Sequence, residues 1–145
     1  MLHIRGYQDY IGLNYYNRDV IDFGWHRPRK GLYNLETSPE GFYESLIALR
    51  KYKKPIYVLE NGVDDASDIS RADFIKEHIE AMMRAQAHGA DIRGYFHWSL
   101  LDNFEWENGF WPRFGLVEID YKTMERKIRQ SAYVYARLIK EQTEK

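Results

Sequence analysis

The chain has 145 residues, with 21 basic and 22 acidic side chains, a formal net charge of −1 and no cysteine. This length suits one domain that buries roughly two thirds of its unfolded surface. Mixed charges without a basic stripe argue against a nucleic-acid partner, and the lack of cysteine excludes disulfides and a thiolate metal site. The N-terminal residues show no apolar signal core, and no apolar run approaches the ~20 residues of a membrane helix. We therefore expect a cytoplasmic protein with no membrane partner, metal or cofactor.

Three segments have the composition of buried β-strands, and they cover residues 7–16, 55–60 and 92–98. Pro55 can only open a strand, because a central position would need its missing N–H. Polar or aromatic groups close the segments: Asn14 and Tyr16, Glu60, and Trp98. Continuous apolar runs are typical of a covered parallel sheet, in which chemistry gathers at the carboxyl ends of the strands. Glu60 could also begin a polar turn, but the three similar endings favour one shared pocket.

Three amphipathic segments predict helices that alternate with these strands, at residues 39–54, roughly 71–88 and about 129–141. Ser38 suits the N-cap of the first helix, and Ser70 with Asp73 resembles a capping box for the second. Gly89 is expected to end the second helix. The apolar positions of the third helix are Ala132, Tyr135, Leu138 and Ile139. This alternation predicts an α/β fold with parallel strands joined by right-handed crossovers.

The connecting segments carry further expectations. Residues 17–37 read as a long irregular loop, which in a compact domain is usually functional or mobile. The acidic residues 64–68 lack the ligand spacing of a calcium loop, so we expect a solvated loop. Residues 107–115 form an aromatic, turn-rich loop, and residues 116–128 predict a small hairpin that turns at Lys122-Thr123.

Aromatic residues make up 16% of the chain, with 12 Tyr, 7 Phe and 4 Trp. Their flat apolar faces and polar edges suit a site that holds sugars. A large aromatic core would need the same residues, so composition leaves both interpretations open.

Four motifs follow one another along the chain: Gly-Leu-Asn-Tyr-Tyr at 12–16, Leu-Glu-Asn-Gly at 59–62, Trp-Ser-Leu-Leu-Asp-Asn-Phe-Glu-Trp at 98–106 and Arg-Phe-Gly-Leu at 113–116. In this order they resemble glycoside hydrolase family 1, the β-glucosidases and β-galactosidases. The resemblance implies a (β/α)₈ TIM barrel, of which residues 1–145 would form the last three βα units of a single domain. Three parallel strands cannot close a barrel, so we expect another chain to complete it.

The resemblance implies that Glu60 is the catalytic nucleophile and that Tyr16 hydrogen-bonds to it. Retaining hydrolysis needs a second carboxyl group, which protonates the leaving group. In the family this acid/base lies in a Thr-(any)-Asn-Glu-Pro segment, and no such segment occurs in the sequence. We therefore expect the isolated chain to be inactive or very weak, with the acid/base Glu supplied by a complementary N-terminal chain.

The resemblance also implies a sugar-binding set. Trp98 would form the platform under the sugar, Glu105 would accept hydrogen bonds from its 4- and 6-hydroxyls, and Trp106 would donate its indole N–H. Asn14 and Phe114 would complete the wall. A carboxylate at position 105 would repel phosphate, which favours an unphosphorylated β-glucoside or β-galactoside. Core packing is the structural alternative for both tryptophans.

Two other interpretations remain open. The chain could be a non-catalytic carbohydrate-binding or scaffold module derived from a glycosidase, with Trp98 and Trp106 as its sugar-binding surface. It could also be a molten or aggregating piece when alone, because exposed strand edges and aromatic side chains invite association.

Overall fold

The computed structural model describes residues 6–18 and 37–143. Strands β1 (Ile11–Asn14), β2 (Ile56–Asn61) and β3 (Ile92–His97) form a parallel sheet in the order β1-β2-β3, as the alternation of elements predicted. The first strand is shorter than the expected 7–16. Most of the loop expected at 17–37 lies outside the described residues, so that expectation stays untested.

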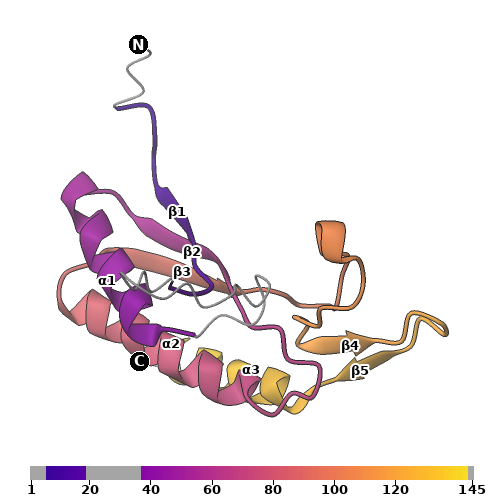
Figure 1. Ribbon diagram of the computed structural model, residues 1–145. Coiled ribbons are helices and arrows are strands. Elements are labelled where there is room, and N and C mark those ends of the chain that lie inside the picture. The colour runs from indigo at the N-terminus through magenta and orange to yellow at the C-terminus, as the bar shows by residue number, and fades with distance from the viewer. Residues whose placement is uncertain (1–5, 19–36, 144–145) are drawn as a thin grey trace, which may run out of the picture.

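Three helices accompany the sheet: α1 (Pro39–Leu49), α2 (Arg71–Ala87) and α3 (Gln130–Thr143). Short 3₁₀ turns, η1 (Arg50–Tyr52) and η2 (Trp106–Asn108), follow α1 and precede the hairpin. The hairpin is confirmed as β4 (Val117–Ile119) paired with β5 (Arg126–Ile128) in antiparallel register. Figure 1 shows the helices on one side of the three strands, with the hairpin beyond the carboxyl end of β3.

The first two helices begin in different ways. Ser38 caps α1 as expected, because its Oγ accepts a hydrogen bond of 3.0 Å from the backbone N–H of Gly41. The capping box expected at Ser70 is wrong: the Ser70 hydroxyl instead donates to Asp65 Oδ2 at 2.9 Å. Asp65 also accepts from the backbone N–H groups of Ser70 and Arg71, at 2.8 and 3.1 Å. The carboxylate that caps α2 therefore comes from the preceding loop.

The acidic segment 64–68 is a structural element rather than the solvated loop we expected. Asp64 accepts the backbone N–H of Arg113 at 2.7 Å, and Asp68 pairs with the buried Arg71 and accepts the backbone N–H of Ser131 at 2.9 Å. Burial alone would raise the pKa of Asp65, but its hydrogen bonds from Ser67, Ser70 and Arg71 lower that pKa to about 2. Through these hydrogen bonds, Asp64 binds the segment after β2 to the loop before the hairpin, Asp65 binds it to the start of α2, and Asp68 binds it to the start of α3.

Two apolar clusters lie on the helical side of the sheet. The first packs β2 and β3 against α1 and α2, around Phe42, Leu46 and Val58. The second packs α2 against α3 and against Leu116, the residue before β4. Of the four apolar residues expected to face inward on α3, Ile139 is the exception, since it is 46% exposed.

The opposite face of the sheet is open. Leu59 is 41% exposed and Phe96 57% exposed, although both belong to central segments of strands. Two glycines leave room for side chains of the neighbouring strand β2. A Cβ on Gly12 would overlap the Leu59 side chain, and one on Gly94 would lie 2.7 Å from the ring of Tyr57. In the described part of the chain, no helix has the length and apolar character needed to cross a bilayer.

Candidate active site

An irregularity in β2 directs Glu60 toward the open face. In β1, Leu13 and Asn14 are neighbours, but their partners in β2 are Val58 and Glu60, so β2 contains one additional residue. Burial along β2 follows the same change: Val58 is buried, Leu59 is exposed and the next buried residue is Asn61. A β-bulge of this kind re-aims a side chain. Without it, strict alternation would place Glu60 on the helical face beside Val58.

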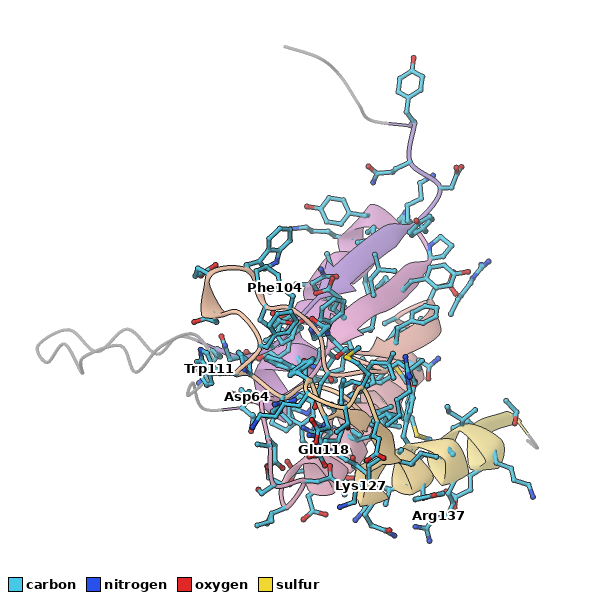
Figure 2. All side chains as sticks on the ribbon, turned by 90° about the vertical axis from the view of Figure 1, so that its right-hand side faces the viewer. Asp64, Phe104, Trp111, Glu118, Lys127 and Arg137 are labelled. Carbon is cyan, nitrogen blue, oxygen red and sulfur yellow. The ribbon has the colours of Figure 1, made fainter. Side chains whose placement is uncertain are left out.

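A pocket of about 560 Å³ lies at the carboxyl ends of the three strands. All seven residues predicted for the site line it: Asn14, Tyr16, Glu60, Trp98, Glu105, Trp106 and Phe114. Further lining residues were not singled out from the sequence, among them Thr37, Gly62 and Asp64. Figure 2 looks from the right-hand side of Figure 1 and shows Asp64, Phe104 and Trp111 in the loops that surround these strand ends.

Glu60 is held by a neighbour from the end of β1. The Tyr16 hydroxyl donates a hydrogen bond of 2.7 Å to Glu60 Oε2, which fixes the direction of the carboxylate. The Tyr16 ring meets the buried Phe114 edge-on, with ring centroids 6.0 Å apart. The geometry therefore joins β1, β2 and the segment before the hairpin around one carboxylate.

The segment after β3 contributes the second carboxylate. Trp98 Nε1 donates to Glu105 Oε1 at 3.1 Å, and the Glu105 side chain is buried. Trp106 differs from both, because it is 78% exposed. The pocket thus has a polar wall made by the half-buried Trp98 and the buried Glu105, and an indole that faces outward.

Two features that the sequence reasoning missed fix the segments next to this wall. A Cβ on Gly62 would overlap the backbone carbonyl oxygen of Trp98, so only glycine permits this approach of the β2 and β3 ends. Asp102 accepts hydrogen bonds from Arg129 Nη1 and Nη2 at 2.8 and 3.1 Å and from the Gly115 N–H at 2.9 Å. Burial would raise the pKa of Asp102, but these donors lower it overall. The sequence did contain a signal for each feature. Gly62 follows the carboxylate at the end of a strand, and Asp102 stands within an aromatic motif.

The pocket contains carboxylate, phenol, indole and amide groups. Among residues 6–18 and 37–143, no group of three or more His, Asp or Glu side chains is arranged to hold a metal ion. Carboxylates with fixed neighbours can act as nucleophile, acid, base or hydrogen-bond acceptor, and exposed indoles can stack on sugar rings.

Comparison with known proteins gives consistent similarities. The profile of Glycosyl hydrolase family 1 matches residues 24–144. A β-galactosidase of Sulfolobus acidocaldarius is 40% identical over 91% of this chain and 31% of its own length. The solved β-glycosidase from Pyrococcus horikoshii superposes with a TM-score of 0.80 at 39% identity, over 90% of this chain and 34% of its own. The solved β-glucosidase from Thermotoga maritima in complex with glucoimidazole gives a TM-score of 0.78 at 34% identity, over 91% and 34%.

The chain therefore spans about a third of the length of the relatives it matches. Its three parallel strands and their helices correspond to a sector of the barrel of those relatives. The rest of such a barrel is not encoded in these 145 residues.

Proposed function

Because the chain belongs to glycosyl hydrolase family 1, we propose that it supplies the nucleophile and much of the sugar site of a retaining β-glycosidase. The observation that carries this proposal is the placement of Glu60, which the bulge in β2 turns into the pocket and the Tyr16 hydroxyl holds at 2.7 Å. The names of the relatives, a β-galactosidase and a β-glucosidase, support a β-linked sugar as the substrate.

In the proposed reaction, a Glu60 oxygen attacks the anomeric carbon and the bond to the leaving-group oxygen breaks. The acid/base carboxyl protonates that oxygen, and it then activates a water molecule that releases the sugar from Glu60. The two carboxyl groups must lie about 5–5.5 Å apart for this double displacement. Glu105 is not the acid/base in this proposal, because its role is to accept hydrogen bonds from the sugar.

The sugar would lie between the tryptophans and the strand ends. Trp98 supplies a flat face whose indole N–H is already bonded to Glu105, so platform and hydroxyl acceptor are held as one unit. Trp106 is exposed and free to turn its indole toward a sugar, while Asn14 and Phe114 line the remaining wall. A carboxylate at Glu105 disfavours a phosphorylated substrate, because like charges repel.

The acid/base would come from a complementary N-terminal chain that adds the first five βα units. The open face of the sheet supports this proposal, since Leu59 and Phe96 are exposed there and a closed barrel would cover them. Both outer strands, β1 and β3, also have one unpaired edge in the described sheet. Closure of a barrel removes such edges.

Complementation tests this proposal. The chain would be assayed alone and mixed with the N-terminal part of the Thermotoga maritima β-glucosidase, cut where its similarity to this chain begins. We expect only the mixture to hydrolyse p-nitrophenyl β-glucoside or β-galactoside. Glu60→Gln should lower the rate of the mixture roughly a thousandfold or more. Equal hydrolysis by the isolated chain, or full activity of the E60Q mixture, would contradict the proposal.

A carbohydrate-binding module is the second candidate function, which the exposed Trp106 beside the pocket favours. A dinitrophenyl 2-deoxy-2-fluoro-β-glucoside separates the two. Its leaving group needs no protonation, so an active nucleophile forms a covalent ester while dinitrophenolate departs with the bonding electrons. A mass increase on the peptide that contains Glu60 supports the glycosidase, whereas sugar binding without any adduct supports the module.

A further inference from the structure

The side chain of Asn61 is fully buried and bridges the ends of the outer strands. Its Nδ2 donates to the backbone carbonyl of Tyr15 at 2.7 Å, and its Oδ1 accepts from the Tyr95 hydroxyl at 2.8 Å. A carbonyl can only accept, so the Tyr15 contact fixes which way the amide faces. From sequence alone, Asn61 was no more than the first half of an Asn-Gly turn.

The bridge connects groups that surround Glu60. Tyr15 precedes Tyr16, the donor to Glu60, and the Tyr15 N–H donates to the Glu60 carbonyl at 2.9 Å. On the other side, the Trp98 N–H donates to the Asn61 carbonyl at 2.9 Å. We propose that Asn61 is a positioning residue, whose amide sets the alignment of Glu60 with Tyr16 and with Trp98. This inference rests on the proposed role of Glu60 as nucleophile.

Tyr95 makes the bridge testable without removing Asn61. Burial raises the pKa of the Tyr95 phenol, so it stays a neutral donor to Asn61 Oδ1 across the range in which proteins fold. Tyr95→Phe keeps the ring that packs in the core but leaves the Asn61 oxygen buried without its donor. The amide must then move, and the strand ends that it joins move with it.

Tyr135→Phe is the matched control. Its hydroxyl donates to the backbone carbonyl of Tyr95 at 3.2 Å, and the two rings are in edge contact at 6.1 Å. The control therefore removes a phenol oxygen from the same neighbourhood without touching the amide of Asn61. Both variants would be studied in the complemented mixture, together with Glu60→Gln.

The measurement is the rate of covalent labelling by the dinitrophenyl fluoroglucoside, followed by intact mass over a series of concentrations. We expect Tyr95→Phe to lower the limiting inactivation rate roughly tenfold or more with little change in the half-saturating concentration, since misalignment acts on the attack. Tyr135→Phe should stay within about twofold of the wild-type rate by the same reasoning.

Each other outcome is decisive. A lower melting temperature of Tyr95→Phe with an unchanged inactivation rate shows that the bridge serves stability alone, which overturns the inference while the role of Glu60 stands. Equal slowing by Tyr95→Phe and Tyr135→Phe also overturns it, because the effect would then be general to that part of the core. If the wild type is not labelled, or Glu60→Gln is labelled as fast, the proposed function fails and the inference fails with it.

Discussion

The two faces of the three-stranded sheet differ in how far the chain completes them. On the helical face, Phe42, Leu46 and Val58 are fully buried by contacts within the chain. Beyond the end of β3, the buried Asp102 is likewise satisfied within the chain, by two arginines and two backbone N–H groups. On the open face, Leu59 is 41% exposed and Phe96 is 57% exposed. The helical face is thus a finished core, while the open face has the form of one side of a larger core.

This difference separates stability from activity. Residues on the helical face should determine whether the 145-residue chain folds, and residues on the open face should gain importance only in a complete barrel. Four predictions test that separation, from the largest expected effect to the smallest.

Removal of the Asp102 carboxylate should have the largest effect on stability. Asp102→Ala leaves the buried Arg129 guanidinium without its partner, which should lower the free energy of unfolding by about 3–5 kcal/mol. Asp91→Ala is the control, because the exposed Asp91–Arg93 pair should contribute less than about 1 kcal/mol. Urea titration of the chain measures both. Equal losses in the two variants would show that the Asp102 cluster is not a finished part of the chain's own core.

A pair of leucine truncations compares the faces directly. Leu46→Ala on the helical face should cost about 2–5 kcal/mol, because the side chain is fully buried. Leu59→Ala should cost under about 1 kcal/mol in the chain alone, because Leu59 is 41% exposed there. Adding the complementary N-terminal piece should increase the cost of Leu59→Ala and leave that of Leu46→Ala unchanged. Unfolding curves with and without the piece measure this, and an unchanged Leu59→Ala cost would argue against a shared core.

Acid should weaken the helical face through the buried His78 and through His97, whose ring nitrogens are buried. Burial lowers the pKa of His78 to about 4, and burial with the nearby Arg71 lowers that of His97 to about 3. Because the unfolded chain binds these protons near pH 6.5, stability should fall as the pH drops from 6.5 toward 4, by on the order of 2 kcal/mol for each histidine. Unfolding free energies measured between pH 7 and 4 test this.

His97→Phe should reduce that pH dependence, since the substitution removes one titrating ring from a site beside Phe74 and Tyr135. In the described part of the chain, neither ring nitrogen of His97 has a hydrogen-bond partner that the substitution would break. A pH profile identical to that of the wild type would exclude His97 as a source of the acid sensitivity.

The start of α2 gives the smallest effect. Asp65→Ala removes the carboxylate that accepts from Ser67, Ser70 and Arg71, which should cost roughly 1–2 kcal/mol. Asp73→Ala should change stability by no more than about 0.5 kcal/mol, because Asp73 is exposed and pairs only with Lys76 in the described structure. Thermal unfolding of both variants gives the comparison. A larger effect at Asp73 than at Asp65 would support the capping box of Ser70 and Asp73 and would contradict the cap by Asp65.

Local patterns in the sequence were enough to predict the parallel alternation, the start of α1 and the hairpin. These features depend on apolar runs, N-cap residues and turn residues within a few positions of one another. The seven site residues were found through motifs, and their gathering in one pocket follows from the parallel order of the strands.

Contacts that lie outside these local patterns explain the rest. The cap of α2 was misassigned because Ser70 has the right identity, yet its hydroxyl is engaged by Asp65 five residues earlier. The glycine requirement at Gly62 depends on the nearby backbone of Trp98, and the contribution of Asp102 to stability depends on its ion pair with Arg129. No period or pair of adjacent residues records such contacts, so they become visible only when the chain is folded.

The additional residue in β2 has a consequence for protein engineering. A carboxylate placed at the end of a regular barrel strand by a single substitution can point to the wrong layer, because side chains alternate along the strand. To transplant this proposed nucleophile onto another scaffold, a designer should move the whole segment from Ile56 to Gly62 and keep its offset against the neighbouring strands. Deleting one residue between Val58 and Glu60 would be the inverse operation, since it would turn the carboxylate toward the helices.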